Sequence, residues 1–218
     1  MPKVGVLLSG CGVFDGAEIH EAVLTLLALD QHQATIVCCA PNIEFDEVDH
    51  RTQKPTGRKR NVLQESARIA RGEIRDLATV RAADLDALIL PGGFGAVKNL
   101  SNLAEKGPQG TVHPDVARLV GDCLAQRKPV GAICIAPAVL ACIAGQRGIS
   151  AKVTIGNDPG VAGQIIALGC QHENRPVTEI TVDADHKLVT TPAYMLGPGP
   201  AAVYEGIRKL VDKVLALI

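Results

Sequence analysis

The amino-acid sequence predicts a single α/β domain, built on a mostly parallel sheet with helices on both faces. Two observations support this fold class. Short apolar runs alternate with helical patterns along almost the whole chain, which favours a parallel sheet. Hydrophobic residues make up 47% of the chain but aromatic residues only 2%, and a core of Val, Leu, Ile and Ala is typical of strands buried on both faces. The length of 218 residues suits one domain over 1–218, without internal repeats.

Hydrophobic periodicity and turn signals assign the elements in order. Strands are expected in the apolar runs 3–9 (a central strand), 34–40, 86–91, the run before Cys134, and 151–156, with a hairpin over 178–191. Helices are expected over 17–30, 61–71, 98–106, 114–127, 137–144, 160–168 and 201–217. The polar stretch 41–60 is predicted to be an excursion that can hold a small hairpin, and 75–83 a connector.

The stretch from Val130 to Pro137 has the pattern of a nucleophile elbow. A short apolar run leads into Cys134, the small residues Ala132 and Ala136 flank it, and a helical pattern follows at once. Such a sharp strand-to-helix turn tolerates only small neighbours, and the N–H groups at the helix N-terminus would favour the thiolate. Taken alone, however, a cysteine among Ala and Ile is more typical of an inert core residue.

The position of Cys134 relative to other strand ends favours the nucleophile. Three strand exits carry residues capable of chemistry: the loop 10–18, the turn at Gly92 and Gly93, and Cys134 itself. Ligands of open α/β sheets bind beyond the carboxyl ends of the strands, where these exits meet. The glycines of the loop 10–18 miss the spacing of a phosphate-binding motif, so a nucleotide site is not expected there.

Composition excludes several classes of protein. The net charge is −1 and no basic block is present, which argues against nucleic-acid binding. No apolar run is long enough to span a membrane, and the run 4–8 is too short for a signal peptide. The seven cysteines include no CxxC pair, so we expect no structural metal, no membrane contact and a reducing, cytoplasmic location.

Several strings resemble a known family. They are the loop 15–18, the turn 90–95, the elbow around Cys134, and the segments 5–13, 18–27, 71–75, 98–101 and 189–195. Together they resemble the PfpI/ThiJ superfamily of class I glutamine-amidotransferase-like proteins, and within it the ElbB type, also described as sigma cross-reacting or isoprenoid biosynthesis proteins. The resemblance covers essentially the whole chain. It implies a flavodoxin-like domain, commonly a homodimer, with a cofactor-free glyoxalase activity that converts glyoxal to glycolate.

The resemblance also implies a set of site residues. Cys134 would be the nucleophile, Glu18 the carboxylate at its sulfur, and the backbone N–H groups of Gly93 and Ile135 the oxyanion site. Many PfpI-like proteases and amidotransferases have a histidine directly after the nucleophile, where this chain has Ile135. No other histidine is an obvious substitute; those considered are His20, His113 and His186. The site is therefore expected to perform aldehyde chemistry rather than amide cleavage.

The resulting hypothesis is a cofactor-independent glyoxalase acting on a small 2-oxoaldehyde, glyoxal or methylglyoxal. Cys134 would form a hemithioacetal, Glu18 would move a proton between the two carbons, and water would release the hydroxy acid. Neither metal nor glutathione is required. The alternatives are a redox or stress-response sensor that uses the same cysteine with Cys11 as resolving thiol, a protein deglycase, and a catalytically idle partner subunit.

Overall fold

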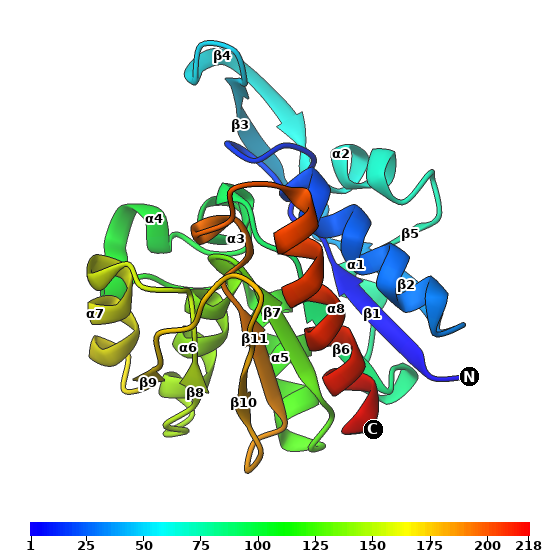
Figure 1. Cartoon of the computed structure of the whole chain (residues 1–218). Helices are drawn as coiled ribbons and strands as arrows, with labels where there is room; N and C mark the ends of the chain where they lie inside the picture. The colour runs from blue at the N-terminus through cyan, green and yellow to red at the C-terminus, as the bar shows by residue number, and fades with distance from the viewer.

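The computed structural model describes residues 1–218 and contains a central seven-stranded sheet (Figure 1). The strand order is β10-β11-β7-β6-β1-β2-β5, and all neighbours are parallel except β10 and β11. The strands are β1 (Lys3–Leu7), β2 (Thr35–Ala40), β5 (Ile74–Asp76), β6 (Ala87–Leu90), β7 (Val130–Ile133), β10 (Thr181–Asp183) and β11 (Leu188–Thr191). The predicted flavodoxin-like fold class, the central position of the first strand and the hairpin near the C-terminus are confirmed.

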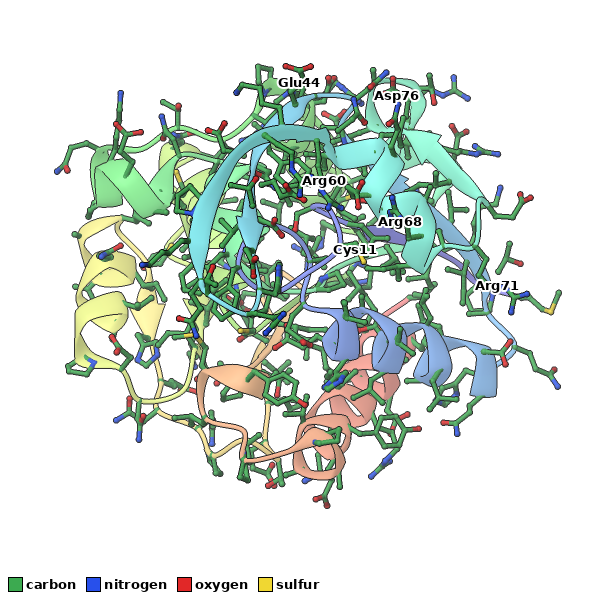
Figure 2. The ribbon with its side chains drawn as sticks, turned by 90° about the horizontal axis from the view of Figure 1, so that it is seen from above. Cys11, Glu44, Arg60, Arg68, Arg71 and Asp76 are labelled. Atoms are coloured by element: carbon green, nitrogen blue, oxygen red, sulfur yellow. The ribbon has the colours of Figure 1, made fainter.

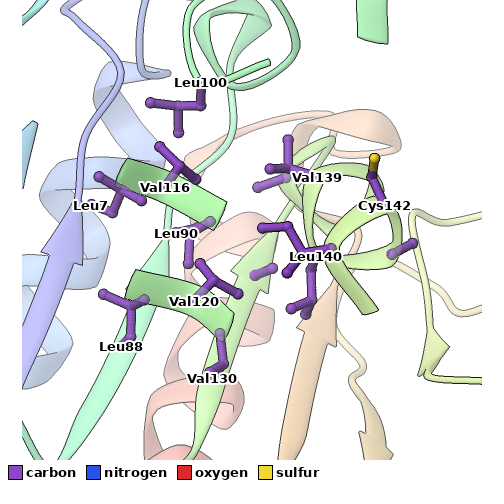
Figure 3. Packing of buried hydrophobic residues seen from close by; sticks show 14 of the residues in the cluster. Leu7, Leu88, Leu90, Leu100, Val116, Val120, Val130, Val139, Leu140 and Cys142 are labelled. Carbon is purple, nitrogen blue, oxygen red and sulfur yellow. The ribbon is translucent and has the colours of Figure 1, made fainter. Parts of the chain in front are cut away.

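Helices cover both faces of the sheet. On one face lie α1 (Ile19–Gln31), α2 (Val62–Ile69) and α8 (Pro200–Ala216), and on the other lie α5 (Pro114–Ala125) and α6 (Ala136–Gln146). Each face has its own hydrophobic core, because successive strand residues point to opposite sides. In β6, Leu88 and Leu90 pack on the α5–α6 side (Figure 3), while Ala87 and Ile89 pack on the α1–α8 side.

A two-stranded hairpin, β3 (Glu44–Asp49) and β4 (Lys54–Asn61), projects from the body of the domain (Figure 1). It confirms the excursion that the polar sequence predicted. The hairpin is tied to the glycine-rich loop after β1, since the Val48 N–H donates to Asp15 Oδ2 at 2.8 Å and the Phe14 N–H donates to His50 Nε2 at 3.3 Å. These contacts fix the loop that precedes α1 and thereby help to position the start of that helix.

Three predicted elements differ in the structure. The helix expected over 98–106 is two short helices, α3 (Phe94–Lys98) and α4 (Leu103–Lys106). The chain leaves the helix at Asn99, whose side-chain amide donates to the carbonyls of Ser9 and Asp15, both at 2.8 Å. The connector expected over 75–83 includes the edge strand β5, followed by the 3-10 turns η1 (Leu77–Thr79) and η2 (Ala82–Asp84).

The strand expected over 151–156 is mostly irregular. Only β8 (Lys152–Val153) is extended in a ladder, and it pairs with β9 (Gln171–His172) in a separate two-stranded sheet. The backbone beyond it bonds to side chains instead, because the Thr154 N–H donates to Thr190 Oγ1 at 2.9 Å. The remaining elements are η3 (Gly107–Gln109), α7 (Pro159–Ala167) and η4 (Ala193–Met195). None of the helices combines the length and the apolar composition that a membrane crossing requires.

Candidate active site

Cys134 lies at a nucleophile elbow between β7 and α6, as the sequence predicts. Its backbone has φ of 61°, a left-handed conformation that is strained for a residue other than glycine. The Cys134 N–H donates to the Thr191 carbonyl of β11 at 2.9 Å, which holds the turn against the neighbouring strand. Ala132 and Ala136 are completely buried, so larger side chains would not fit beside the turn.

The carboxyl group at the Cys134 thiol belongs to Glu21. The two side chains lie side by side, since a Cβ at Gly92 would meet both Cys134 Cβ and Glu21 Oε2, and each shifts the pKa of the other. Glu21 is fully buried on the face of α1 that packs on the sheet. Its Oε2 accepts from the Gly92 N–H at 3.0 Å and its Oε1 accepts from the Tyr194 N–H at 3.1 Å. Three strand exits therefore meet at this one carboxyl group.

Glu18 occupies a different place from the one expected. It is the N-cap of α1, where its Oε2 accepts from the Glu21 N–H at 2.7 Å. The helix begins at Ile19 rather than at residue 17, and a carboxylate at the cap satisfies one of the free N–H groups of the first turn. Glu18 still lines the cavity that contains Cys134. The assignment of Glu18 as the carboxylate at the sulfur is therefore corrected to Glu21.

Burial dominates the electrostatics of the pair. It raises the pKa of Glu21 to about 8, even though the N–H groups of Tyr194 and Gly92 and the Cys134 thiol act in the opposite direction. Burial also raises the pKa of Cys134 well above its usual range, and the charge of Glu21 adds to that effect. At neutral pH the pair therefore holds both protons. The N–H groups of Gly93 and Ile135 favour the thiolate, as expected for the start of a helix, but desolvation of the buried sulfur outweighs them.

The backbone N–H groups of Gly93 and Ile135, which are predicted to form an oxyanion site, point toward the Cys134 sulfur. Both lower the pKa of the thiol. Gly93 has φ of 92°, and a Cβ there would collide with the backbone of Glu18 and Gly16. Glycine is therefore required at this position to bring the N–H to the sulfur.

A cavity of about 340 Å³ opens above the sulfur. Its walls are mainly apolar, and the only charged side chain among them is Glu18. The lining residues are Val13, Glu18, Gly93, Phe94, Cys134, Ile135, Val161, Tyr194 and Met195. The arrangement can accept a small uncharged molecule, attack it with sulfur, and stabilise an oxyanion with backbone N–H groups.

Glu21 and Tyr194 are the residues that the sequence analysis missed. Glu21 shares its helix face with the buried small residues Ala22, Thr25 and Ala28. Small side chains along one helix face indicate that this face packs closely on the sheet. An acidic residue on the same face therefore indicates a buried carboxyl group. Tyr194 follows β11 at the far end of the sequence, and nothing in the local pattern indicates its contact with α1.

No histidine contacts Cys134. His20 Nδ1 lies 2.7 Å from the Tyr194 hydroxyl at the edge of the cavity. His113 is the N-cap of α5, and His186 binds Asp183 in the hairpin turn. The site is thus a cysteine with a carboxyl group rather than a Cys-His triad.

Cys11, considered as a resolving thiol, has different surroundings from Cys134. The charged groups around it are Glu65, Arg68, Asp15 and Arg60, and Figure 2 shows it in the same region as Arg60 and Arg68. It is half-buried and does not line the Cys134 cavity. No group of three or more His, Cys, Asp or Glu side chains could hold a metal ion.

The fold and the elbow define a class I glutamine-amidotransferase-like domain. A solved DJ-1 superfamily structure from Agrobacterium tumefaciens shares the fold, with a TM-score of 0.60 at 18% identity over 100% of this chain and 92% of that one. A structure from Ehrlichia chaffeensis, described as an isoprenoid biosynthesis protein with an amidotransferase-like domain, is much more similar: its TM-score is 0.94 at 36% identity, covering 100% of this chain and 99% of that one. No family model matches the chain.

Curated relatives give the family. The human glutamine amidotransferase-like class 1 domain-containing protein 3 is 43% identical over 99% of this chain and 83% of its own length. The rat ES1 protein homolog is 42% identical over 99% of this chain and 84% of its own length. The chain belongs to this family of glutamine amidotransferase-like class 1, or ES1, proteins. Both relatives are named as mitochondrial proteins, which overturns the expectation of a cytoplasmic location.

Proposed function

We propose that the protein is a cofactor-independent glyoxalase that converts glyoxal to glycolate, with methylglyoxal as a further substrate. The observation that carries this proposal is the buried Cys134–Glu21 pair, with two backbone N–H groups at the sulfur, below a small apolar cavity. A protonated carboxyl group beside a thiol can both accept and return a proton without water. An uncharged aldehyde suits such a cavity better than a peptide or a charged amide substrate.

In the first step, the Cys134 sulfur adds to one aldehyde carbon. The S–C bond forms, the C=O π bond breaks, and the thiol proton passes by way of the Glu21 carboxyl group to the new oxygen. The N–H groups of Gly93 and Ile135 are close enough to the sulfur to stabilise that oxygen while it carries negative charge. The product is a hemithioacetal.

In the second step, a carboxylate removes the hydrogen from the hemithioacetal carbon and returns a proton to the neighbouring carbon. We assign this transfer to Glu18, because Glu18 lines the cavity while the Glu21 carboxyl group lies at the sulfur. The intermediate is an ene-diol, and its collapse leaves a thioester on Cys134 and a hydroxymethyl group. The step is an internal redox isomerisation, so it consumes no external oxidant.

In the third step, water attacks the thioester carbonyl. The S–C bond breaks, the Glu21 carboxyl group gives its proton to the sulfur and takes one from the attacking water, and glycolic acid leaves. The balance is one glyoxal and one water in, one glycolic acid out.

A redox sensor stands second to this function, because a sensor thiol has a low pKa and is exposed, whereas burial raises the pKa of Cys134 and leaves its side chain 7% exposed. Assembly as a homodimer also stays a prediction.

The experiment measures glycolate formed from glyoxal by the purified protein. The buffer contains no amine and no thiol, so that glycolate cannot arise by deglycation of an adduct. Wild type should form glycolate, Cys134→Ala should form none above background, and Cys11→Ser should match wild type because Cys11 lies outside the cavity. Glycolate formation that survives in Cys134→Ala would rule the mechanism out.

A further inference from the structure

Tyr194 lies just after the C-terminal end of β11 and is part of the site. Its N–H donates to Glu21 Oε1 at 3.1 Å, and its side chain lines the cavity above Cys134. The preceding residue, Ala193, is held at φ of 44° and is fully buried. Strained backbone of this kind persists only where its surroundings fix it. The position of Tyr194 is therefore determined by the same carboxyl group that contacts the nucleophile.

The Tyr194 hydroxyl has an unusual place among the cavity groups. Apart from the thiol, it is the only side-chain hydrogen-bond donor among the lining residues. A tyrosine hydroxyl has one proton and two lone pairs. When His20 Nδ1, 2.7 Å away, donates to that oxygen, the hydroxyl proton is free to point into the cavity. Burial and the charges of Glu18 and Glu21 raise the pKa of Tyr194, so the hydroxyl stays protonated at neutral pH.

A 2-oxoaldehyde has two carbonyl oxygens, and the backbone N–H groups at the sulfur serve only the oxygen on the attacked carbon. We propose that Tyr194 donates a hydrogen bond to the second carbonyl oxygen of the Cys134-bound substrate, and that His20 is the positioning residue that orients its hydroxyl. The identity of the ligand rests on the glyoxalase function proposed above. The assignment itself extends the site to a donor and a histidine beyond the expected set of residues.

The test compares Tyr194→Phe with Tyr204→Phe. Phenylalanine keeps the ring and the backbone N–H to Glu21, so the loss is confined to the hydroxyl. Tyr204 is the other tyrosine of the chain; its hydroxyl donates to Gln31 at 2.5 Å, away from the cavity. Two quantities are measured with glyoxal as probe, at a pH above about 8, where the pair has lost its first proton and iodoacetamide can alkylate a thiolate. They are kcat/KM for glycolate and the glyoxal concentration that protects Cys134 from iodoacetamide, which is read by peptide mass spectrometry with Cys11 as internal reference.

Tyr194→Phe should require about tenfold more glyoxal for protection, with a matching fall in kcat/KM, as expected for one lost hydrogen bond. Tyr204→Phe should stay within about twofold of wild type. If the two variants behave alike, or if glyoxal does not protect Cys134 in wild type, the proposal is overturned. If wild type is protected but forms no glycolate, the glyoxalase function fails, and the protection measurement still decides the role of Tyr194.

His20 is tested by rescue. His20→Ala should weaken protection in the same direction as Tyr194→Phe, and the double variant should be no worse than Tyr194→Phe alone, because both remove one interaction. His20→Asn places an amide donor near the position of Nδ1 and should recover most of the loss. A His20→Ala variant that equals wild type, or one that Asn does not rescue, would exclude the positioning role.

Discussion

The Glu21 carboxyl group lies beside the Cys134 thiol, and each group shifts the pKa of the other. This contact joins α1, which follows β1, to the elbow that follows β7, two strands away in the sheet. The same carboxyl group also accepts from Gly92 and Tyr194. One buried side chain therefore influences three features of the site. They are the pKa of Cys134, the geometry of the turn after β6, and the position of Tyr194 after β11. Changes at Glu21 should therefore alter reactivity, its pH dependence and stability together.

Replacing Glu21 should reduce glyoxal turnover more than any other carboxyl replacement. Glu21→Gln removes the group that moves the thiol proton, and we expect a loss in kcat of about 10²- to 10⁴-fold, the usual contribution of a general acid–base. Glu18→Gln should also lower kcat, because Glu18 lines the cavity, and Glu105→Gln, at an exposed position of α4, should not. The kinetics of the three variants check this. Normal turnover in Glu21→Gln would show that the pair is not the catalytic unit.

The pH dependence should follow the titration of the pair. Below a pH of about 8, where the pKa of Glu21 lies, the pair holds both protons and contains no thiolate. As pH rises through this value the pair loses its first proton, and a thiolate beside a neutral carboxyl group becomes accessible. We expect kcat/KM for glyoxal to rise through that region and then level off. A flat or falling profile there would contradict the assignment, and Glu21→Gln should lack the inflection.

Glu21 should also make stability depend on pH. Its folded pKa of about 8 lies above the ordinary value of 4.5, so between these values the folded chain holds a proton that the unfolded chain has lost. The resulting stabilisation is fully present below 4.5 and is lost as pH rises to about 8, on the order of a few kcal/mol. Urea unfolding across this window should show a decline that is steeper in wild type than in Glu21→Gln. Parallel curves would refute the raised pKa.

Gly92 should tolerate no side chain. A Cβ at this position would lie 2.5 Å from Cys134 Cβ and 2.7 Å from Glu21 Oε2, so Gly92→Ala must separate the reacting groups. We expect loss of glyoxal turnover and destabilisation of about 1–3 kcal/mol, as for an overpacked core. Gly163→Ala in α7, where a Cβ meets nothing within 4 Å, should be neutral or slightly stabilising. Unfolding and turnover measured on both variants decide the point.

Much of the architecture could be predicted from the sequence. Parallel strands buried on both faces read as continuous apolar runs, so β1, β2, β6 and β7 are visible locally. The elbow at Cys134 and the turn at Gly93 are also local patterns, and the parallel sheet places them together. The edge strand β5 and the short strand β8 were missed or overextended, because each depends on a partner strand rather than on its own residues.

By itself, the sequence determined the fold class, the elbow at Cys134 and the strand exits that surround it, because periodicity and small residues encode them within a few positions. Only the tertiary structure decided which carboxyl group meets the sulfur. Glu18 and Glu21 both stand at the start of α1, and the cap geometry that turns Glu18 onto its own helix leaves Glu21 facing the sheet. The same packing brings Tyr194 from the C-terminal end onto Glu21. Contacts of this kind depend on how a helix packs on a sheet, and no local sequence pattern predicts that packing.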